Sequence, residues 1–301
     1  MNGLTRFLLF GNYFYGFCVI ALSIEASLQQ HVLLNKPAYY LFVFVATVLY
    51  YTHAYIAEPN GGAANKRSVW YVEHRVFITG SQLFFTILFI ILGSYLIKEN
   101  FSGILAITVT QWVIIGIFPV VAALYYGSVK PLGLTRTLRS NGWLKPFVIG
   151  FVWAGAVTVY PVIFSSIEHK TPFSPGLLSF LLFIKNFMFI TMLCIMFDIK
   201  DYAADYNQQL KTFVVRYGLR TTIFYILIPL SLIGLGTFLI YANLLHFPLL
   251  RIIVNTIPFI LLIIVAYSMH QRKSILYYLA IIDGLMLVKA VCGIIGINFI
   301  K

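Results

Sequence analysis

The chain is short of charge, and above all of acidic residues. Of its 301 residues, 10% are charged and nine are Asp or Glu, whereas 60% are hydrophobic. The mean hydropathy is +0.90. Soluble domains carry about 25% charged residues, so this composition excludes an ordinary soluble protein. The sequence therefore predicts an integral membrane protein.

Cysteine is also scarce. The three cysteines, Cys18, Cys194 and Cys292, lie inside apolar runs, and no Cys-x-x-Cys pair occurs. This spacing supports neither a disulfide framework nor a zinc site, so we expect small packing residues. The shortage of acids leaves a net charge of +12. Because the basic residues lie in short segments between apolar runs, we expect a membrane surface as their partner, and no nucleic acid.

Runs of about 20 apolar residues, the length that crosses about 30 Å of hydrocarbon, recur along the whole chain. The N-terminal segment resembles a signal peptide, because it has Arg6, then an apolar run, then Ala21-Leu22-Ser23. We expect no cleavage there, so that the apolar run forms the first span. No loop is long enough for a soluble domain. We therefore expect an all-α bundle, a single membrane domain over residues 1–301. Its nine transmembrane helices are expected near 7–26, 37–57, 76–97, 102–126, 147–167, 175–198, 220–241, 248–267 and 277–299.

Basic residues are distributed unequally over the loops between these spans. With the N-terminus in the cytoplasm, fourteen Lys and Arg lie on the cytoplasmic side, five on the outer side, and Lys185 and Lys289 within spans. The positive-inside rule favours this orientation, which puts the C-terminus on the opposite side. The longer polar loops, near 58–75, 127–146 and 199–219, then all face the cytoplasm.

Three of the nine acidic residues gather at the end of the sixth predicted span. If the helix continues, Asp198, Asp201 and Asp205 fall within about 60° of one another on one face. Three like charges this close repel, and a cation that neutralises them lets the cluster persist at neutral pH. Mg²⁺ binds carboxylates together with substrate phosphates, so the cluster predicts a metal site for a diphosphate. The alternative is a solvated acidic turn at the membrane surface.

The loop at 127–146 places cations on the same side of the membrane. Its basic residues are Lys130, Arg136, Arg139 and Lys145. They can hold phosphate oxygens by charge-assisted hydrogen bonds, or they only satisfy the positive-inside rule. A metal-bound diphosphate still carries negative charge for such cations to neutralise. We therefore expect Lys130, Arg136 and Arg139 to hold the diphosphate leaving group, with Lys130 as a catalytic residue.

Two motifs lie in these loops. One reads Asp198-Ile199-Lys200-Asp201-Tyr202-Ala203-Ala204-Asp205, followed by Lys211-Thr212, and the other is Tyr126-x-x-x-Lys130. They resemble the second aspartate-rich motif and the Tyr-x-x-x-Lys element of the UbiA superfamily of intramembrane prenyltransferases, and the resemblance covers the full length. It implies Mg²⁺-dependent transfer of a prenyl group from a polyprenyl diphosphate to a small or lipophilic, hydrophobic or aromatic acceptor at the cytoplasmic face. It also implies that Asp198, Asp201 and Asp205 are catalytic and bind Mg²⁺, and that Tyr126 and Lys211 bind the substrate.

The chain departs from the family pattern at the end of the second span. The family has a first motif, Asn-x-x-x-Asp-x-x-x-Asp, where this chain has Tyr50, Ala54 and Glu58. His53 can supply a nitrogen ligand or bind a phosphate, and the alternative is a packed histidine. Because two acidic or amide ligands are missing, a noncatalytic binder of prenyl or lipid diphosphates with the same fold is the main alternative to an enzyme.

Ionisable residues also lie inside predicted spans: Lys185 in the sixth, and Asp283 and Lys289 in the ninth. Such groups usually face a cavity or a partner, so we expect Lys185 to face a protein cavity, with pairing to Asp283 as an alternative. Lys185 precedes Asp198 by 13 residues, roughly 20 Å along a helix, too far to touch a diphosphate beside the aspartates. A transporter using these three residues as an ion path is a weaker candidate, since no charged series repeats across spans.

Aromatic residues make up 17% of the chain. We expect most of them in the core or at the membrane interfaces, with a few along a prenyl tunnel, where a ring face can stabilise an allylic cation. Below the acidic cluster, helical spacing brings Phe187, Thr191 and Cys194 to one face. We expect that face to border the cavity.

Overall fold

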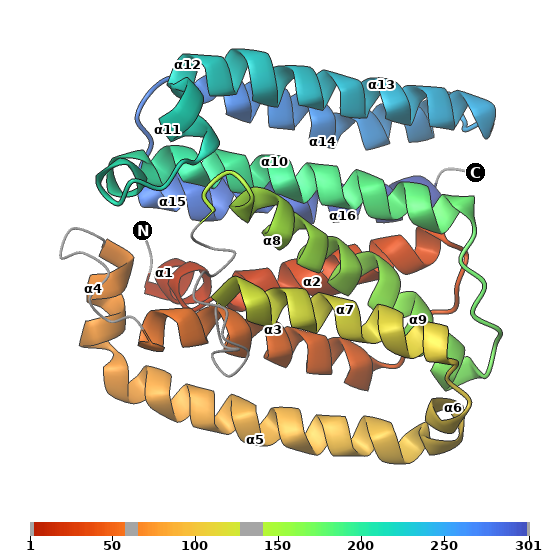
Figure 1. Cartoon of the computed structure of the whole chain (residues 1–301). Helices are drawn as coiled ribbons and strands as arrows, with labels where there is room; N and C mark the ends of the chain where they lie inside the picture. The colour runs from red at the N-terminus through yellow and green to blue at the C-terminus, as the bar shows by residue number, and fades with distance from the viewer. Residues whose placement is uncertain (1–2, 58–65, 127–140, 300–301) are drawn as a thin grey trace.

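The computed structural model describes residues 3–57, 66–126 and 141–299, and these residues form helices and no strand (Figure 1). The first part of the chain contains α1 (Gly3–Phe10), α2 (Tyr13–Gln29), α3 (Pro37–Ala57), α4 (Lys66–Glu73), α5 (Arg75–Glu99), α6 (Phe101–Leu105) and α7 (Val109–Tyr126). The second part contains α8 (Lys145–Ala154), α9 (Tyr160–His169), α10 (Leu177–Asn207), α11 (Phe213–Tyr217), α12 (Leu219–Thr221), α13 (Ile228–Leu244), α14 (Leu249–Ser268), α15 (Ile275–Tyr277) and α16 (Gly284–Asn298). The predicted all-α fold class is confirmed.

Short π-helical segments join three pairs of helices end to end. The segments are η3 (Gly155–Val159) between α8 and α9, η4 (Thr222–Leu227) between α12 and α13, and η5 (Tyr278–Ile282) between α15 and α16. Pro161 follows η3 and Pro229 follows η4. A proline lacks the N–H for the preceding turn and its ring displaces a carbonyl of that turn, so a wider turn relieves the clash. No proline follows η5, which ends next to Asp283.

The described helices identify a multi-pass membrane protein. Six helical spans are long and apolar enough to cross a membrane, or seven if the bent pair α1 and α2 counts as one. Large apolar side chains cover the outer helices, such as Leu83 on α5, 64% exposed, and Ile240 on α13, 65% exposed. A surface of this kind fits hydrocarbon and not water. The expected count of nine spans is not confirmed.

The helix predicted near 102–126 is interrupted. α6 ends at Leu105 and α7 begins at Val109. The Gln111 side chain accepts a hydrogen bond of 2.8 Å from the Thr108 backbone N–H, and the Thr108 hydroxyl accepts one of 3.3 Å from the Gln111 backbone N–H. This reciprocal capping box starts a new helix. As a result, α7 has 18 residues, and its stretch Val109–Tyr125 is among the shorter apolar helices.

The span predicted at 7–26 is also broken, because α1 and α2 meet at an angle of 66°. Asn12, at the break, has a left-handed φ of 65°. The Phe10 carbonyl accepts hydrogen bonds from Arg67 Nη2 at 3.0 Å and from the Tyr71 hydroxyl at 2.9 Å. Asn12 donates to the Tyr71 hydroxyl at 2.9 Å and accepts from Arg67. Side chains of α4 thus satisfy polar groups that a bend in apolar surroundings would leave unpaired.

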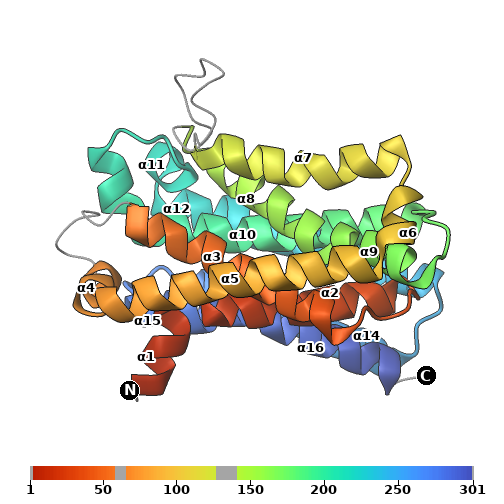
Figure 2. The same cartoon turned by 90° about the horizontal axis from the view of Figure 1, so that it is seen from below.

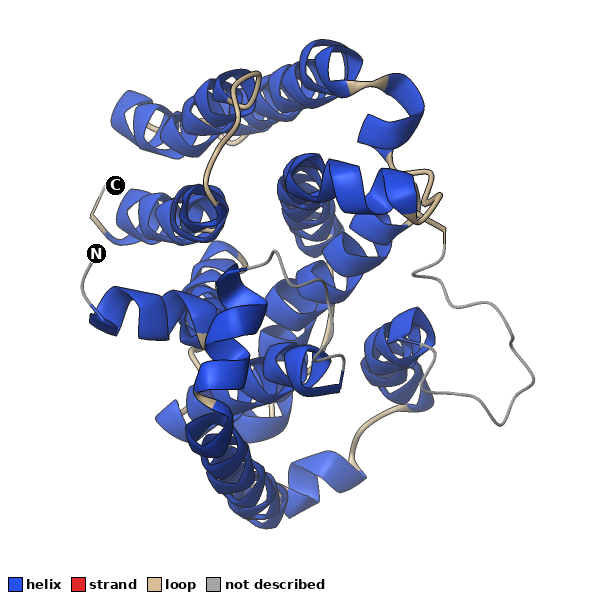
Figure 3. Cartoon of the chain, turned by 90° about the vertical axis from the view of Figure 1, so that its left-hand side faces the viewer, coloured by secondary structure: helices blue, strands red, loops and turns tan. Residues whose placement is uncertain are grey.

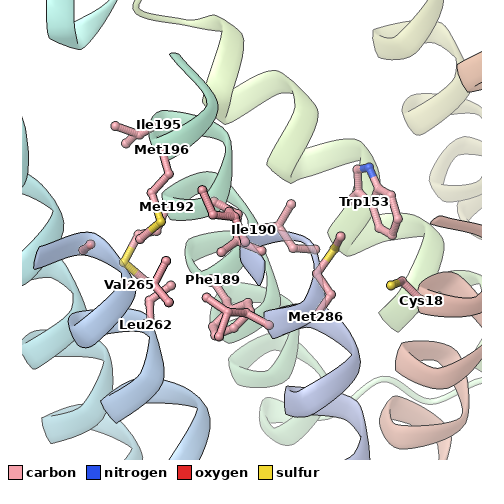
Figure 4. Packing of buried hydrophobic residues seen from close by; sticks show 14 of the residues in the cluster. Cys18, Trp153, Phe189, Ile190, Met192, Ile195, Met196, Leu262, Val265 and Met286 are labelled. Carbon is pink, nitrogen blue, oxygen red and sulfur yellow. The ribbon is translucent and has the colours of Figure 1, made fainter. Parts of the chain in front are cut away.

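α10 forms the centre of the bundle and packs against α8, α11 and α13, while α16 packs against α2 and α14 (Figures 1 and 2). The residues of the main core come from α2, α8, α10, α14, α16 and the three π-helical segments, and include Cys18, Trp153, Phe189, Met192, Met196, Leu262, Val265 and Met286 (Figure 4). All three cysteines are free; Cys18 and Cys292 are buried, as expected of packing residues, whereas Cys194 is half-buried. Contacts on several sides therefore fix the second half of α10, which carries the acidic cluster.

The bundle has two ends, which we name after elements found there. α1, α4 and α11 lie at the α11 end, whereas α6, the start of α10 and the start of α14 lie at the α6 end (Figures 1 and 2). The N- and C-terminal marks lie at opposite ends in Figure 1. The acidic cluster, near the close of α10, is therefore at the α11 end.

Candidate functional site

A cavity of about 210 Å³ lies toward the α11 end, among α2, α3, α4, α8, α10 and α16. Figure 3 looks onto this end of the bundle. Its charged lining residues are Arg67, Lys145, Lys200, Asp201 and Asp283, and its aromatic and apolar lining residues are Tyr15, Tyr51, Tyr55, Ile149, Trp153, Ile190, Leu193, Cys194, Phe197 and Met286. Ile190, Trp153 and Met286 also belong to the core shown in Figure 4, so core residues form part of the cavity wall. We call the charged lining residues the rim of the cavity.

α10 continues without a break to Asn207, so the three aspartates stand on one helix as expected. Their environments differ. Asp198 is completely buried, Asp205 is buried and 6% exposed, and Asp201 lines the cavity. Helical spacing thus brings the three carboxylates together, but it is Asp201 that faces the space where a ligand fits.

An ion pair links α8 to the acidic cluster. Lys145 Nζ lies 3.0 Å from Asp198 Oδ1. Lys145 is the first residue of α8, where the helix dipole disfavours a cation, and the carboxylate compensates for this. Asp198 Oδ2 is buried and has no hydrogen-bond partner among the described residues. One cation of the predicted basic loop, Lys145, therefore does face the aspartates.

The face of α10 that borders the cavity is rotated from the predicted one. Gly150 lets α8 pack closely on α10, since a Cβ there would lie 2.3 Å from Thr191 Oγ1. The ring of Phe187 lies 6.3 Å from a phenylalanine ring of α8. Phe187 and Thr191 thus face α8, and the prediction that they border the cavity is wrong. Cys194 does line it, together with residues on its other side.

Arg67 is a lining residue that the sequence did not single out. It is buried, and its guanidinium carbon lies 4.3 Å from the centroid of the Tyr55 ring. Burial acts to lower the pKa of Arg67, but the neighbouring Tyr55 and Tyr15 hydroxyls raise it, and the net pKa lies above the usual value. The guanidinium therefore stays charged. Arg67 and Tyr71 lie one turn apart on α4, and this spacing is the sequence feature that could have identified Arg67.

Two carboxylates reach the cavity from different helices. Asp201 Oδ1 lies 3.2 Å from Lys200 Nζ. Asp283 Oδ2 accepts a hydrogen bond of 2.8 Å from the Tyr15 hydroxyl. The suggested pairing of Lys185 with Asp283 is therefore wrong, and Lys185 contacts residues of α2 instead. The cavity rim carries both signs of charge.

The remaining predicted site residues lie on the surface or outside the described residues. Lys211 is exposed, and its backbone packs against Gly142, where a Cβ would lie 2.8 Å from the Lys211 carbonyl carbon. The described part of the 127–146 loop thus meets the 199–219 segment at the α11 end. His53 is exposed on α3 and is not a lining residue of the cavity. Outside the described residues lie Glu58, Lys130, Arg136 and Arg139, and also the side chain of Tyr126, whose backbone ends α7.

The aspartates do not form a preassembled metal centre. Across residues 3–57, 66–126 and 141–299, no group of three His, Cys, Asp or Glu side chains is placed to hold a metal ion. Of the three aspartates, Asp201 lines the cavity, whereas Asp198 and Asp205 are buried and do not line it. Mg²⁺ is usually bound by one or two carboxylates together with substrate phosphates. These residues therefore fit an Mg²⁺ ion that arrives with a diphosphate.

Comparison with known proteins does not assign a function to this cavity. The function is therefore inferred from the cavity itself and from the motif Asp198 to Asp205. Comparison of the chain with protein-family models, with curated proteins and with solved structures finds no match in any of the three.

Proposed function

We propose that the protein is a membrane-embedded prenyltransferase of the UbiA type. It has nine transmembrane helices and a cytoplasmic N-terminus, and it transfers a prenyl group from a polyprenyl diphosphate to a small or lipophilic acceptor at the cytoplasmic face. The composition of the cavity carries this proposal, because three cations and two carboxylates line its rim while aromatic and aliphatic side chains line most of the rest. A prenyl diphosphate has the same division into an anionic head and an apolar chain.

The charge balance at the rim favours a divalent cation. Lys145 is paired with Asp198, and Lys200 with Asp201. A diphosphate adds several negative charges, which are costly where the surroundings are poorly polarisable. Bound Mg²⁺ supplies Lewis-acid stabilisation of the diphosphate leaving group. Asp201 and Asp198 would hold the ion, with Asp205 as the third proposed ligand, and the lining cations would hold phosphate oxygens.

Aromatic rings line the same cavity as the charged residues. Tyr15 and Tyr51 stack with their ring centroids 4.6 Å apart, and the Trp153 indole N–H donates to the Tyr51 hydroxyl. Ring faces stabilise the allylic cation that develops as the bond from carbon to the diphosphate oxygen breaks. The acceptor's nucleophile then bonds to the allylic carbon and loses a proton. Asp283, which faces the same space, is placed to accept that proton.

A binding titration tests the metal and diphosphate parts of this proposal. Purified full-length protein is titrated with a nonhydrolysable polyprenyl diphosphate analogue, once with Mg²⁺ and once with a chelator. We expect binding to require Mg²⁺ and to be lost in Asp201→Asn. Glu99→Gln, which alters an exposed carboxylate at the other end of the bundle, is the matched control and should bind like the parent. Equal affinity with metal and with chelator, or parent-like binding by Asp201→Asn, would refute the proposal.

A noncatalytic binder of prenyl or lipid diphosphates is the second candidate. Two observations favour it: Asp198 is completely buried in its pair with Lys145, and Tyr50 and Ala54 stand where the family has Asn and Asp. Each reduces the number of metal ligands. Incubation with a polyprenyl diphosphate and candidate acceptors, followed by mass spectrometry, separates the two candidates. Metal-dependent binding without diphosphate release or prenylated product supports the binder, whereas either product supports the enzyme.

A further inference from the structure

A second cavity, of about 120 Å³, lies toward the α6 end. Residues of α2, α10, α13, α14 and α16 line it, and none of them lines the first cavity. Lys185 is one of the lining residues, which confirms the prediction that it faces a protein cavity. The function proposed for the α11 end makes no use of this space.

A buried carboxylate on α2 is shared by two lysines beside this cavity. Glu25 is 1% exposed, and its Oε2 accepts a hydrogen bond of 2.7 Å from Lys289 Nζ. Its Oε1 lies 3.6 Å from Lys185 Nζ, which also donates to Gln29 Oε1 at 3.0 Å. Because Lys289 is the closer partner, Lys185 is only partly neutralised. Positive charge is therefore left at the cavity wall, where Lys185 and Gln29 are exposed to the space and Lys289 is not.

Arg251, on the first turn of α14, adds a second cation to the same wall. Its guanidinium carbon lies 3.9 Å from the centroid of the Phe247 ring. Its Nε is buried without a hydrogen-bond partner, and it forms no ion pair with a carboxylate in the described part of the chain. A buried donor without a partner is costly. The wall thus combines excess positive charge with an unused hydrogen-bond donor.

Apart from Thr237, Tyr241 and Asn255, the rest of the wall is apolar. It includes Leu181 and Phe189 of α10, Phe238 of α13 and Phe259 of α14. A small hydrated anion loses its water on entering such surroundings and gains nothing from these side chains. An amphiphile gains from both parts of the wall, because its chain buries apolar surface while its head meets the cations.

We propose that this cavity binds an anionic amphiphile. Its carboxylate or phosphate head contacts Lys185 and Arg251, and one hydrocarbon chain lies against the aromatic rings of α10, α13 and α14. The small volume, about 120 Å³, fits a segment of one chain and not two. The site is independent of the prenyl transfer proposed above.

Fluorescence titration with cis-parinaric acid, a single-chain carboxylic acid, tests the site in delipidated full-length protein. We expect the acid to bind at least about tenfold more tightly than its methyl ester, since a charge-assisted hydrogen bond is lost in the ester. Arg251→Gln and Lys185→Met should each weaken binding of the acid by about tenfold for the same reason. Lys98→Gln removes an exposed cation from α5 at the same end and should bind like the parent.

Competition experiments then identify the source of the anionic head. Displacement of the probe by lysophosphatidic acid or by a second fatty acid, but not by inorganic phosphate, supports the amphiphile. Displacement by inorganic phosphate at a similar concentration would mean a plain anion site and overturn the proposal. Equal affinity for the acid and the ester, or parent-like affinity in Arg251→Gln, would overturn it too. Arg251→Gln breaks no ion pair with a described residue, so this variant is expected to fold, and Asp201→Asn should leave parinaric acid binding unchanged.

Discussion

Lys145 and Asp198 join α8 to α10 through a carboxylate that water does not reach. Such a pair adds little net stability, because both ions lose hydration on burial. Breaking the pair is costly, because no other cation among the described residues lies as close to the remaining carboxylate. Asp198 is therefore held in a structural role before any metal is considered, and its second oxygen is what remains for a ligand.

Lys145→Met is expected to lower the free energy of unfolding by about 3 kcal/mol, because it strands a buried carboxylate. Lys200→Met is the matched control, since the side chain of its partner Asp201 is 38% exposed. Its loss should cost about 1 kcal/mol or less. Thermal unfolding in detergent measures both. The double variant Lys145→Met, Asp198→Asn should recover most of the lost stability, and equal shifts in Tm for the two single variants would contradict this account.

Among the elements, α4 shows how a helix outside the membrane spans can organise those inside. Arg67 and Tyr71 bind the Phe10 carbonyl where α1 and α2 separate, and Arg67 also lines the cavity. The bend is therefore coupled to the cavity rim through one side chain. α10 has the complementary role: its 31 residues run past both cavities, with Lys185 on the wall of one and Asp201 on the wall of the other.

The start of α7 depends on its capping box. Thr108→Ala removes one half of that box and should destabilise the first turn of α7 by about 1 kcal/mol. Thr110→Ala, at an exposed position of the same turn, is the control and should have little effect. Hydrogen exchange of the backbone amides near residue 111 measures the change. Similar exchange in the two variants would show that packing, and not the cap, defines this boundary.

For the whole molecule, the two ends of the bundle carry different chemistry. The α11 end has the acidic cluster and the larger cavity, and the α6 end has the cavity lined by Lys185 and Arg251. The unequal distribution of basic residues predicts which end faces the cytoplasm. The sequence assigns fourteen Lys and Arg to the cytoplasmic side and five to the outer side, and α4 and α11, which belong to the cytoplasmic group of loops, lie at the α11 end.

Cysteine labelling in intact membranes checks this orientation. Asn207 and Ser174 are exposed and lie at opposite ends of the bundle. A cysteine at Asn207 is expected to react from the cytoplasmic side, and one at Ser174 from the outer side. Cys194 lines a cavity and is replaced by Ala in the background used for both. Reaction of the Asn207 cysteine from the outer side alone would reverse the topology and remove the cytoplasmic prenyl transfer proposed above.

The sequence alone predicts the membrane class, the helical fold and the placement of the aspartates on one helix face. Hydrocarbon thickness dictates the length of apolar runs, and helical periodicity dictates which side chains share a face. The cost of a charge in the membrane likewise predicts that Lys185 meets a cavity. These properties depend on local composition and spacing, and they can be read from neighbouring residues.

Only the tertiary structure decided which groups meet. Glu25 and Lys289 are 264 positions apart in the chain, and Tyr15 and Asp283 are 268 apart, yet each pair forms a hydrogen bond. Periodicity says that Phe187 and Thr191 share a face, but the close approach of α8 at Gly150 decided that this face meets a helix and not the cavity. The partner of a helix face is set by packing between distant segments, for which a single sequence carries no local signal.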